Sequence, residues 1–213
     1  MRHQLPAWLL LAALLAGAGC LQSLHPLYSE KGKDTVYLPE LAGNWLTLAN
    51  EDGEIEPQSR WQLRPAGGGY SITITEKGQA AEFEGWVVEI GAAHYLDTWP
   101  RDAGFLANQV LKLHLLPAHL FWRAEARPYG WLLELVFSNE LYDDLKSAEP
   151  PLSRQRLDRD YVVLDASPAQ LREFLRAGQA RPAYLHGTVR LALVSGEEAA
   201  RTYQAQLGAD LGD

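Results

Sequence analysis

Histidine is the residue type in this chain that is best suited to metal binding or to acid–base chemistry near neutral pH. Beyond the first nineteen residues, histidines stand at positions 25, 94, 114, 119 and 186. His114 and His119 are five residues apart across Pro117, a spacing that does not place both on one face of a strand without a bend. His94 and Asp97 are three apart and would point to opposite faces of a strand. Neither pair has the spacing of a zinc site, so we predict no metal site.

Motifs for serine-based or phosphate chemistry do not occur in this sequence. There is no Gly-x-Ser-x-Gly elbow, in which a nucleophilic serine sits on a sharp strand-to-helix turn. Gly67-Gly68-Gly69 lies between strand-like segments, without the following helix and lysine that a phosphate-binding loop requires. We predict no catalytic residue and no cofactor, and hence that the protein is not an enzyme. An enzyme would need His94, His114 or His119 to converge with a carboxylate in the fold.

Aromatic side chains are the most conspicuous candidates for ligand binding in this chain, and most of them lie on strand-like segments. In a small barrel such side chains either fill the interior or line a pocket for an apolar ligand. Alternation along a strand does not say which face points inward, so both outcomes stay open. If the interior is hollow, the candidate residues for ligand binding are Trp61, Tyr70, Ile72, Trp86, Tyr95 and Trp122.

Alternation of apolar and polar residues dominates the chain as far as Phe137 and predicts β-strands. Glycine-containing turns such as Glu76-Lys77-Gly78-Gln79 separate them, which indicates hairpins. Because an antiparallel meander has two exposed edges unless it curls, we predict a lipocalin-like closed barrel of about eight strands, with a two-sheet sandwich as the alternative. The expected strands are 45–49, 61–63, 70–75, 81–90, 93–98, 109–116, 119–127 and 131–137.

Helical signals follow the meander. Ser167 can act as an N-cap, Pro168 occupies the first helical position, and Gln170 completes a capping box. Residues 184–194 alternate like a strand, and residues 195–198 offer a second capping box before a C-terminal helix. The fold class is therefore mainly β, with a C-terminal helical extension of the barrel.

The first nineteen residues have the layout of a secretory signal peptide. Arg2 lies in a short polar start, residues 5–16 are almost wholly apolar, and small residues fill positions 17–19. The apolar stretch is shorter than the ~20 residues with which a helix crosses a bilayer. We therefore expect residues 1–19 to direct export.

Residues 14–20, Leu-Leu-Ala-Gly-Ala-Gly-Cys, resemble the lipobox of bacterial lipoproteins. The resemblance implies cleavage before Cys20 and attachment of lipid, including palmitate, to its thiol, which would hold the protein to a membrane of the cell envelope. Cys20 is the only cysteine, so it has no disulfide partner within the chain. In an envelope with two membranes, Leu21 after the cysteine favours the periplasmic face of the outer membrane. Residues 23–28, 40–45 and 111–119 also resemble segments of uncharacterised bacterial lipoproteins, which implies no function.

Gly43-Asn44-Trp45 resembles the Gly-x-Trp signature of lipocalins and related calycin barrels. In that family the tryptophan closes one end of an eight-stranded barrel under the first strand, and a later arginine packs over its ring. The resemblance implies that Gly43 and Trp45 form a structural motif. It also implies that Arg123 or Arg159 supplies the arginine, through a cation–π contact.

Charge and length complete the sequence-based picture. Removal of residues 1–19 leaves 18 basic and 27 acidic residues, a formal charge of −9, which repels nucleic acid. We divide the chain into a signal peptide (1–19), a tether (20–34), a barrel domain with its C-terminal helix (35–194) and a C-terminal helix or tail (195–213). Two functions stay open: binding of a hydrophobic small molecule or lipid, and contact with another envelope protein through the surface of a filled barrel.

Overall fold

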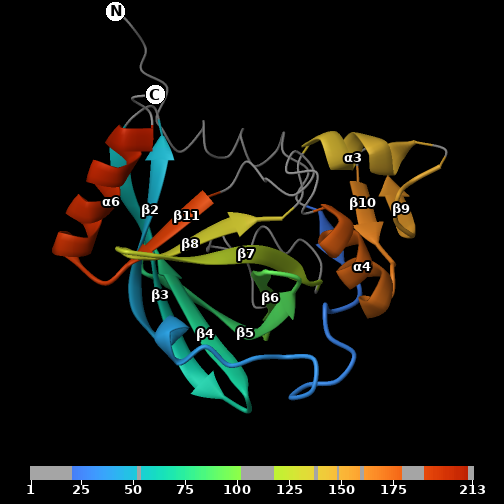
Figure 1. Cartoon of the computed structure of the whole chain (residues 1–213), viewed down its shortest axis with the longest axis horizontal. Helices are drawn as coiled ribbons and strands as arrows, with labels where there is room; N and C mark the ends of the chain where they lie inside the picture. The colour runs from blue at the N-terminus through green and yellow to red at the C-terminus, as the bar shows by residue number, and fades with distance from the viewer. Residues whose placement is uncertain are drawn as a thin grey trace, which may run out of the picture.

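The computed structural model describes residues 21–51, 54–101, 118–136, 139–147, 149–158, 161–178 and 190–210. Eight strands form a closed antiparallel barrel, and three more form a separate sheet beside it (Figure 1). The predicted mainly β fold, with a closed barrel and a C-terminal helix, is confirmed, and the sandwich alternative is excluded. The signal segment and Cys20 lie outside the described residues.

The barrel and the second sheet use different parts of the chain. Around the barrel the strands are β11 (Arg190–Val194), β2 (Gly43–Glu51), β3 (Glu54–Ala66), β4 (Gly69–Glu76), β5 (Gln79–Ile90), β6 (Ala93–Pro100), β7 (Leu120–Arg127) and β8 (Gly130–Leu135). The second sheet, called the small sheet below, has the order β1 (Gln22–Ser23), β10 (Tyr161–Leu164) and β9 (Arg154–Asp158). Within the described residues, the helical elements are η1 (Pro39–Leu41), α3 (Asn139–Lys146), α4 (Pro168–Gly178) and α6 (Glu197–Asp210). None of the described helices combines the length and the apolar character that crossing a membrane requires.

The strand that closes the barrel is β11, which comes late in the chain. It pairs antiparallel with β8 and with β2, so that Leu193 has Trp131 on one side and Thr47 on the other. Strand-like alternation was evident over 184–194, but the sequence-based count placed all eight barrel strands earlier, one of them over 109–116. That segment lies outside the described residues, and the eighth position in the ring belongs to β11. Alternation identifies a strand but not its neighbours.

Two hairpins of the barrel have two-residue turns with positive φ at both central residues. These are Gly67 and Gly68 between β3 and β4, with φ of 57° and 85°, and Lys77 and Gly78 between β4 and β5, with φ of 49° and 78°. Turns of this kind match the right-handed twist of the strands they join, and glycine adopts them without a steric penalty. The turns predicted from the glycines therefore have a direct backbone reason.

Apolar side chains from all eight strands occupy the barrel interior. Trp61 on β3 and Trp122 on β7 lie four strands apart in the ring of eight, and their rings meet edge to face with centroids 6.0 Å apart. Each indole N–H is satisfied inside the barrel, by Ser59 Oγ at 3.0 Å and by Thr98 Oγ1 at 3.2 Å respectively. Side chains from opposite walls therefore touch across the axis. The other buried members of this core are Leu41, Leu63, Tyr70, Ile72, Ile74, Ala81, Phe83, Val87, Leu96, Leu120, Ala124, Trp131, Leu133, Leu135 and Leu193.

A second core lies between the outer face of the barrel and the small sheet with α3 and α4. Trp86 on β5 and Tyr95 on β6 point outward into it, whereas their chain neighbours Val87 and Leu96 point inward. The second half of β5, the middle of β6 and the first part of β7 are thus buried on both faces. This explains why apolar residues run almost continuously along these strands instead of alternating strictly.

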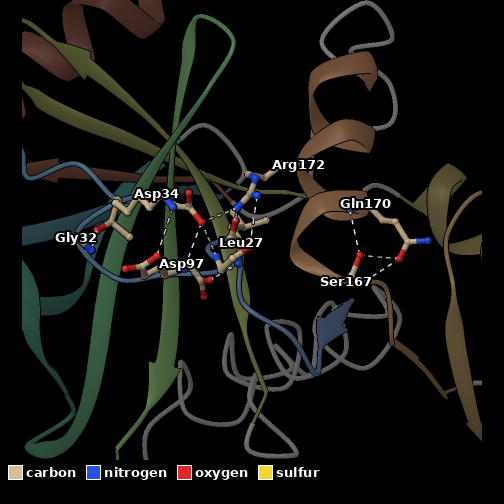
Figure 2. A network of polar contacts seen from close by, with 11 residues as sticks. Leu27, Gly32, Asp34, Asp97, Ser167, Gln170 and Arg172 are labelled. Atoms are coloured by element: carbon tan, nitrogen blue, oxygen red, sulfur yellow. Dashed lines mark hydrogen bonds and ion pairs between the residues drawn. The ribbon is translucent and has the colours of Figure 1, made fainter.

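Two helices hold to this body in different ways. α4 begins with the predicted capping box, in which the Ser167 N–H donates to Gln170 Oε1 at 2.9 Å (Figure 2). It buries Leu171 and Leu175 against the second core. α6 lies against β2 and β11, where Tyr203 contacts the ring of Tyr129 with centroids 4.9 Å apart.

We expect Trp122→Ala to lower the free energy of unfolding by about 3–5 kcal/mol, because it leaves a cavity opposite Trp61. Trp45→Ala is the matched control, since Trp45 is only partly buried and a loss of roughly half that size follows from its smaller buried area. Urea unfolding followed by circular dichroism measures both. Equal losses for the two variants would contradict the packing described for the barrel axis.

Candidate functional site

Residues 21–37, called the strap below, run from β1 of the small sheet along the outer face of the barrel to Val36, which pairs with Val87 on β5. Leu21, Gln22 and Ser23 are at most 1% exposed, and Leu27 is fully buried. Ser23 pairs with His119 at the entry of β7 through two backbone hydrogen bonds of 3.0 and 2.8 Å. The sequence analysis assigned residues 20–34 to a tether. From Leu21 onward, this segment is part of the folded body. The reason is that its apolar side chains find partners in the second core.

One residue of the strap, Leu27, links the barrel to α4 through its backbone. The Leu27 N–H donates to Asp97 Oδ2 on β6 at 2.8 Å, and the Leu27 carbonyl accepts from Arg172 Nη1 on α4 at 2.9 Å (Figure 2). Both bonds join segments far apart in the chain. Leu27 is consequently held on two sides by side chains of different layers.

Asp34 fastens the strap a second time. Its Oδ2 accepts the backbone N–H groups of Ser29 at 2.7 Å and Glu30 at 3.2 Å, and lies 3.2 Å from Arg172 Nη1 (Figure 2). The Ser29 N–H is the main cause that holds the pKa of Asp34 below its usual value, with help from Glu30 and Arg172. Arg172 thereby contacts both ends of the bend that residues 27–34 make.

Asp97 and His119 form a buried pair beneath the strap. Asp97 Oδ1 and His119 Nδ1 are 2.6 Å apart, with side chains 1% and 9% exposed. Asp97 lies opposite Phe121 in the β6–β7 ladder, so His119, two residues before Phe121, lies on the same outer face of the barrel. The ring of Trp99 covers His119 with centroids 4.6 Å apart. Both carboxyl oxygens of Asp97 are thus used, one by the histidine and one by the strap.

Burial governs the protonation of Asp97. Burial raises the pKa of its carboxyl above the ordinary value, although the His119 ring and the Leu27 N–H act in the opposite direction. The pKa of Tyr28 on the strap is also raised, by burial first and then by Asp97 and Glu84. A carboxyl with a raised pKa keeps its proton to a higher pH than it does in the unfolded chain. Protonation of Asp97 therefore makes the free energy of unfolding of the domain depend on pH.

An aspartate–histidine pair is also a component of many acid–base catalytic sites. The sequence analysis required a histidine close to a carboxylate if the protein were an enzyme, and His119 lies close to the carboxyl group of Asp97. His114 lies outside the described residues. The hydroxyl of Ser23, whose backbone pairs with His119, donates to the carbonyl of His25 at 2.7 Å. In the part of the chain that the structure describes, no group of three or more His, Cys, Asp or Glu could hold a metal. The two oxygens of Asp97 fasten the strap and His119 to β6.

The six residues proposed from the sequence as ligand contacts do not form one group. Four of them, Trp61, Tyr70, Ile72 and Trp122, face the barrel core, while Trp86 and Tyr95 face the second core. The Tyr70 hydroxyl donates to the Leu38 carbonyl at 2.8 Å, and burial raises its pKa to about 12. Trp86 is covered by the strap, with Lys31 Nζ 3.7 Å from its ring centroid. A single pocket would not be lined by all six.

The Gly-x-Trp segment lies at the start of β2. Trp45 is partly buried against the barrel core, and its Nε1 donates to the Leu41 carbonyl at 3.0 Å. A Cβ on Gly43 would come within 3.3 Å of the Trp45 indole, so a larger residue here would require the ring to shift slightly. Arg123 lies on the outer face of β7, where its Nη1 is 3.9 Å from Glu134 Oε2, and Arg159 lies outside the described residues. Arg123 is therefore engaged away from the barrel interior.

Sequence reasoning did not identify Asp97, Leu27 and Arg172 as partners. The one local signal was an acidic residue in the otherwise apolar run of β6, since a carboxyl group on a buried strand needs hydrogen-bond partners. Its partners stand 70 positions earlier and 22 positions later in the chain. Only the fold brings them together.

Asp97→Asn is expected to change the pH dependence of stability. Between the ordinary aspartate pKa of 3.8 and the raised value in the folded protein, the folded wild type binds a proton that the unfolded chain has released. Wild-type stability should therefore fall with rising pH relative to the variant, whose amide does not titrate. Urea unfolding of both proteins across this range measures the difference, and a constant difference would contradict the raised pKa.

Comparison with protein-family models, with curated proteins and with solved structures yields no match for this chain.

Proposed function

We propose that this chain is a lipid-anchored protein of the bacterial cell envelope, in which the barrel is a packed scaffold and the outer surface contacts another envelope protein. The observation that carries the proposal is the contact between Trp61 and Trp122 across the barrel axis. A scaffold of this kind binds through its exterior, because its interior is taken by its own side chains.

The packing of the barrel supports a scaffold over a container. Ligand pockets typically occupy about 300–1,000 Å³ and are lined by side chains that leave a space between them. Here the two tryptophans from opposite walls are in contact, and their N–H groups are paired with the interior hydroxyls of Ser59 and Thr98. An apolar ligand at this level would have to displace the indoles.

The start of the folded body supports the proposed anchor. Leu21, the residue that follows the proposed lipidation site, is 1% exposed and belongs to the second core. The lipobox-like segment, residues 14–20, ends at the only cysteine of the chain. In an envelope with two membranes, the protein would face the periplasm from the outer membrane.

Cys20→Ser should leave the protein soluble or its precursor uncleaved, because the thiol is the only attachment point for the lipid. Cell fractionation combined with labelled palmitate measures the outcome. Leu24→Ser, a change at an exposed position nearby, is the matched control and should stay lipidated. Wild-type protein that carries no lipid would remove the anchor from the proposal.

A titration separates the scaffold from a ligand-binding barrel. Protein produced from Leu21 onward should show no saturable change in tryptophan fluorescence with fatty acids, phospholipids or lysolipids below ~100 µM. The reason is that Trp61 and Trp122 already occupy the axis of the barrel. Micromolar binding of any of these amphiphiles would instead favour the binding of a hydrophobic small molecule or lipid.

A further inference from the structure

We propose that the bilayer lies directly against the corner of the molecule formed by Leu24 and the small sheet, with no flexible spacer between lipid and domain. The outer face of β3 then points away from the membrane. This inference rests on the proposed lipid anchor at Cys20 and adds to it an orientation of the body relative to the membrane.

The first step concerns the residues that follow the proposed anchor, which hydrogen bonds hold to the folded body. Gln22 and Ser23 are at most 1% exposed and pair with β10, while Ser23 also pairs with His119. The Leu24 N–H donates to the Leu164 carbonyl at 2.9 Å. Consecutive Cα atoms are about 3.8 Å apart, so Cys20 lies within about 8 Å of Gln22. A lipid on Cys20 therefore starts at the surface of the folded body.

The second step locates the part of the surface nearest to that lipid. β1 runs parallel to β10, with Gln22 beside Val163, and β10 pairs with β9, with Val163 beside Gln155. Neighbouring strands lie about 4.8 Å apart, so Gln155 on the edge strand lies about 10 Å from Gln22. The small sheet thus lies within about 10 Å of the residues that follow Cys20.

The third step is the character of that surface. Among the described residues, Leu24 is one of two large hydrophobic side chains that are exposed, at 37%. It stands four residues after Cys20, within about 14 Å of it even along an extended chain. A single exposed leucine is ordinary on a soluble surface, but beside a lipid anchor it can enter the apolar boundary of the bilayer.

The last step identifies the face that points away. β7, to which the strap is pinned through His119, and β3 lie four strands apart in the ring of eight. Arg64 is exposed on the outer face of β3. The barrel therefore lies between Arg64 and β1, and Figure 1 shows the small sheet to one side of the barrel.

The test uses two single substitutions, Gln155→Cys and Arg64→Cys, in the full-length protein. Lipidation blocks the thiol of Cys20, so each variant has one free thiol for a fluorophore. After reconstitution into phosphatidylethanolamine–phosphatidylglycerol vesicles that contain a spin-labelled lipid, the label at position 155 should be quenched several-fold more than the label at position 64. Insertion of about twelve Gly and Ser residues between Cys20 and Leu21, a spacer of about 20 Å, should remove this difference.

The outcomes separate this inference from the anchor itself. Equal quenching of the two labels in palmitate-labelled protein overturns the orientation and leaves the anchor standing. Absence of palmitate label overturns the anchor, and the orientation with it. Leu24→Ser in the Gln155→Cys protein should weaken the quenching at position 155, and unchanged quenching would exclude Leu24 as a membrane contact.

Discussion

The carboxyl group of Asp97 lies where the barrel, the strap and the entry of β7 meet, and the arrangement of the other layers depends on it. One oxygen faces His119 at 2.6 Å and the other accepts the Leu27 N–H at 2.8 Å. Burying a carboxyl without partners costs several kcal/mol, so the strap has to follow the path that supplies its N–H to this group. Arg172 donates to the carbonyl of the same residue, Leu27, and so ties α4 to the strap.

The barrel is asymmetric because the strands on one side of it bury side chains on both their inner and their outer faces. Over β5 to β7, inward side chains such as Val87 and Trp122 build the barrel core, and outward side chains such as Trp86 and Phe121 build the second core. A three-stranded sheet with a two-residue edge strand has little stability of its own. It persists here because the strap and the barrel wall supply the apolar surface that it covers. The two sheets therefore form one body.

This construction gives the proposed lipid anchor a mechanical consequence. In a protein with a long tether, the domain rotates freely above the membrane, whereas here the described core begins with Leu21. Orientation relative to the bilayer would then be set by the same hydrogen bonds that hold the strap. The packed barrel would act as the rigid part that presents an outer surface, and the pKa of Asp97 would link that rigidity to pH.

The sequence by itself determined the elements whose cause is local. Alternation, turn glycines and the Ser167 capping box predicted most strands, the hairpins and α4, because each depends on residues within one or two turns of chain. Tertiary structure alone decided that β11 closes the ring, that Trp61 meets Trp122 while Trp86 faces outward, and that Asp97 finds its partners. Those facts depend on strand order and register, which join residues 22 to 70 positions apart and which no local pattern records.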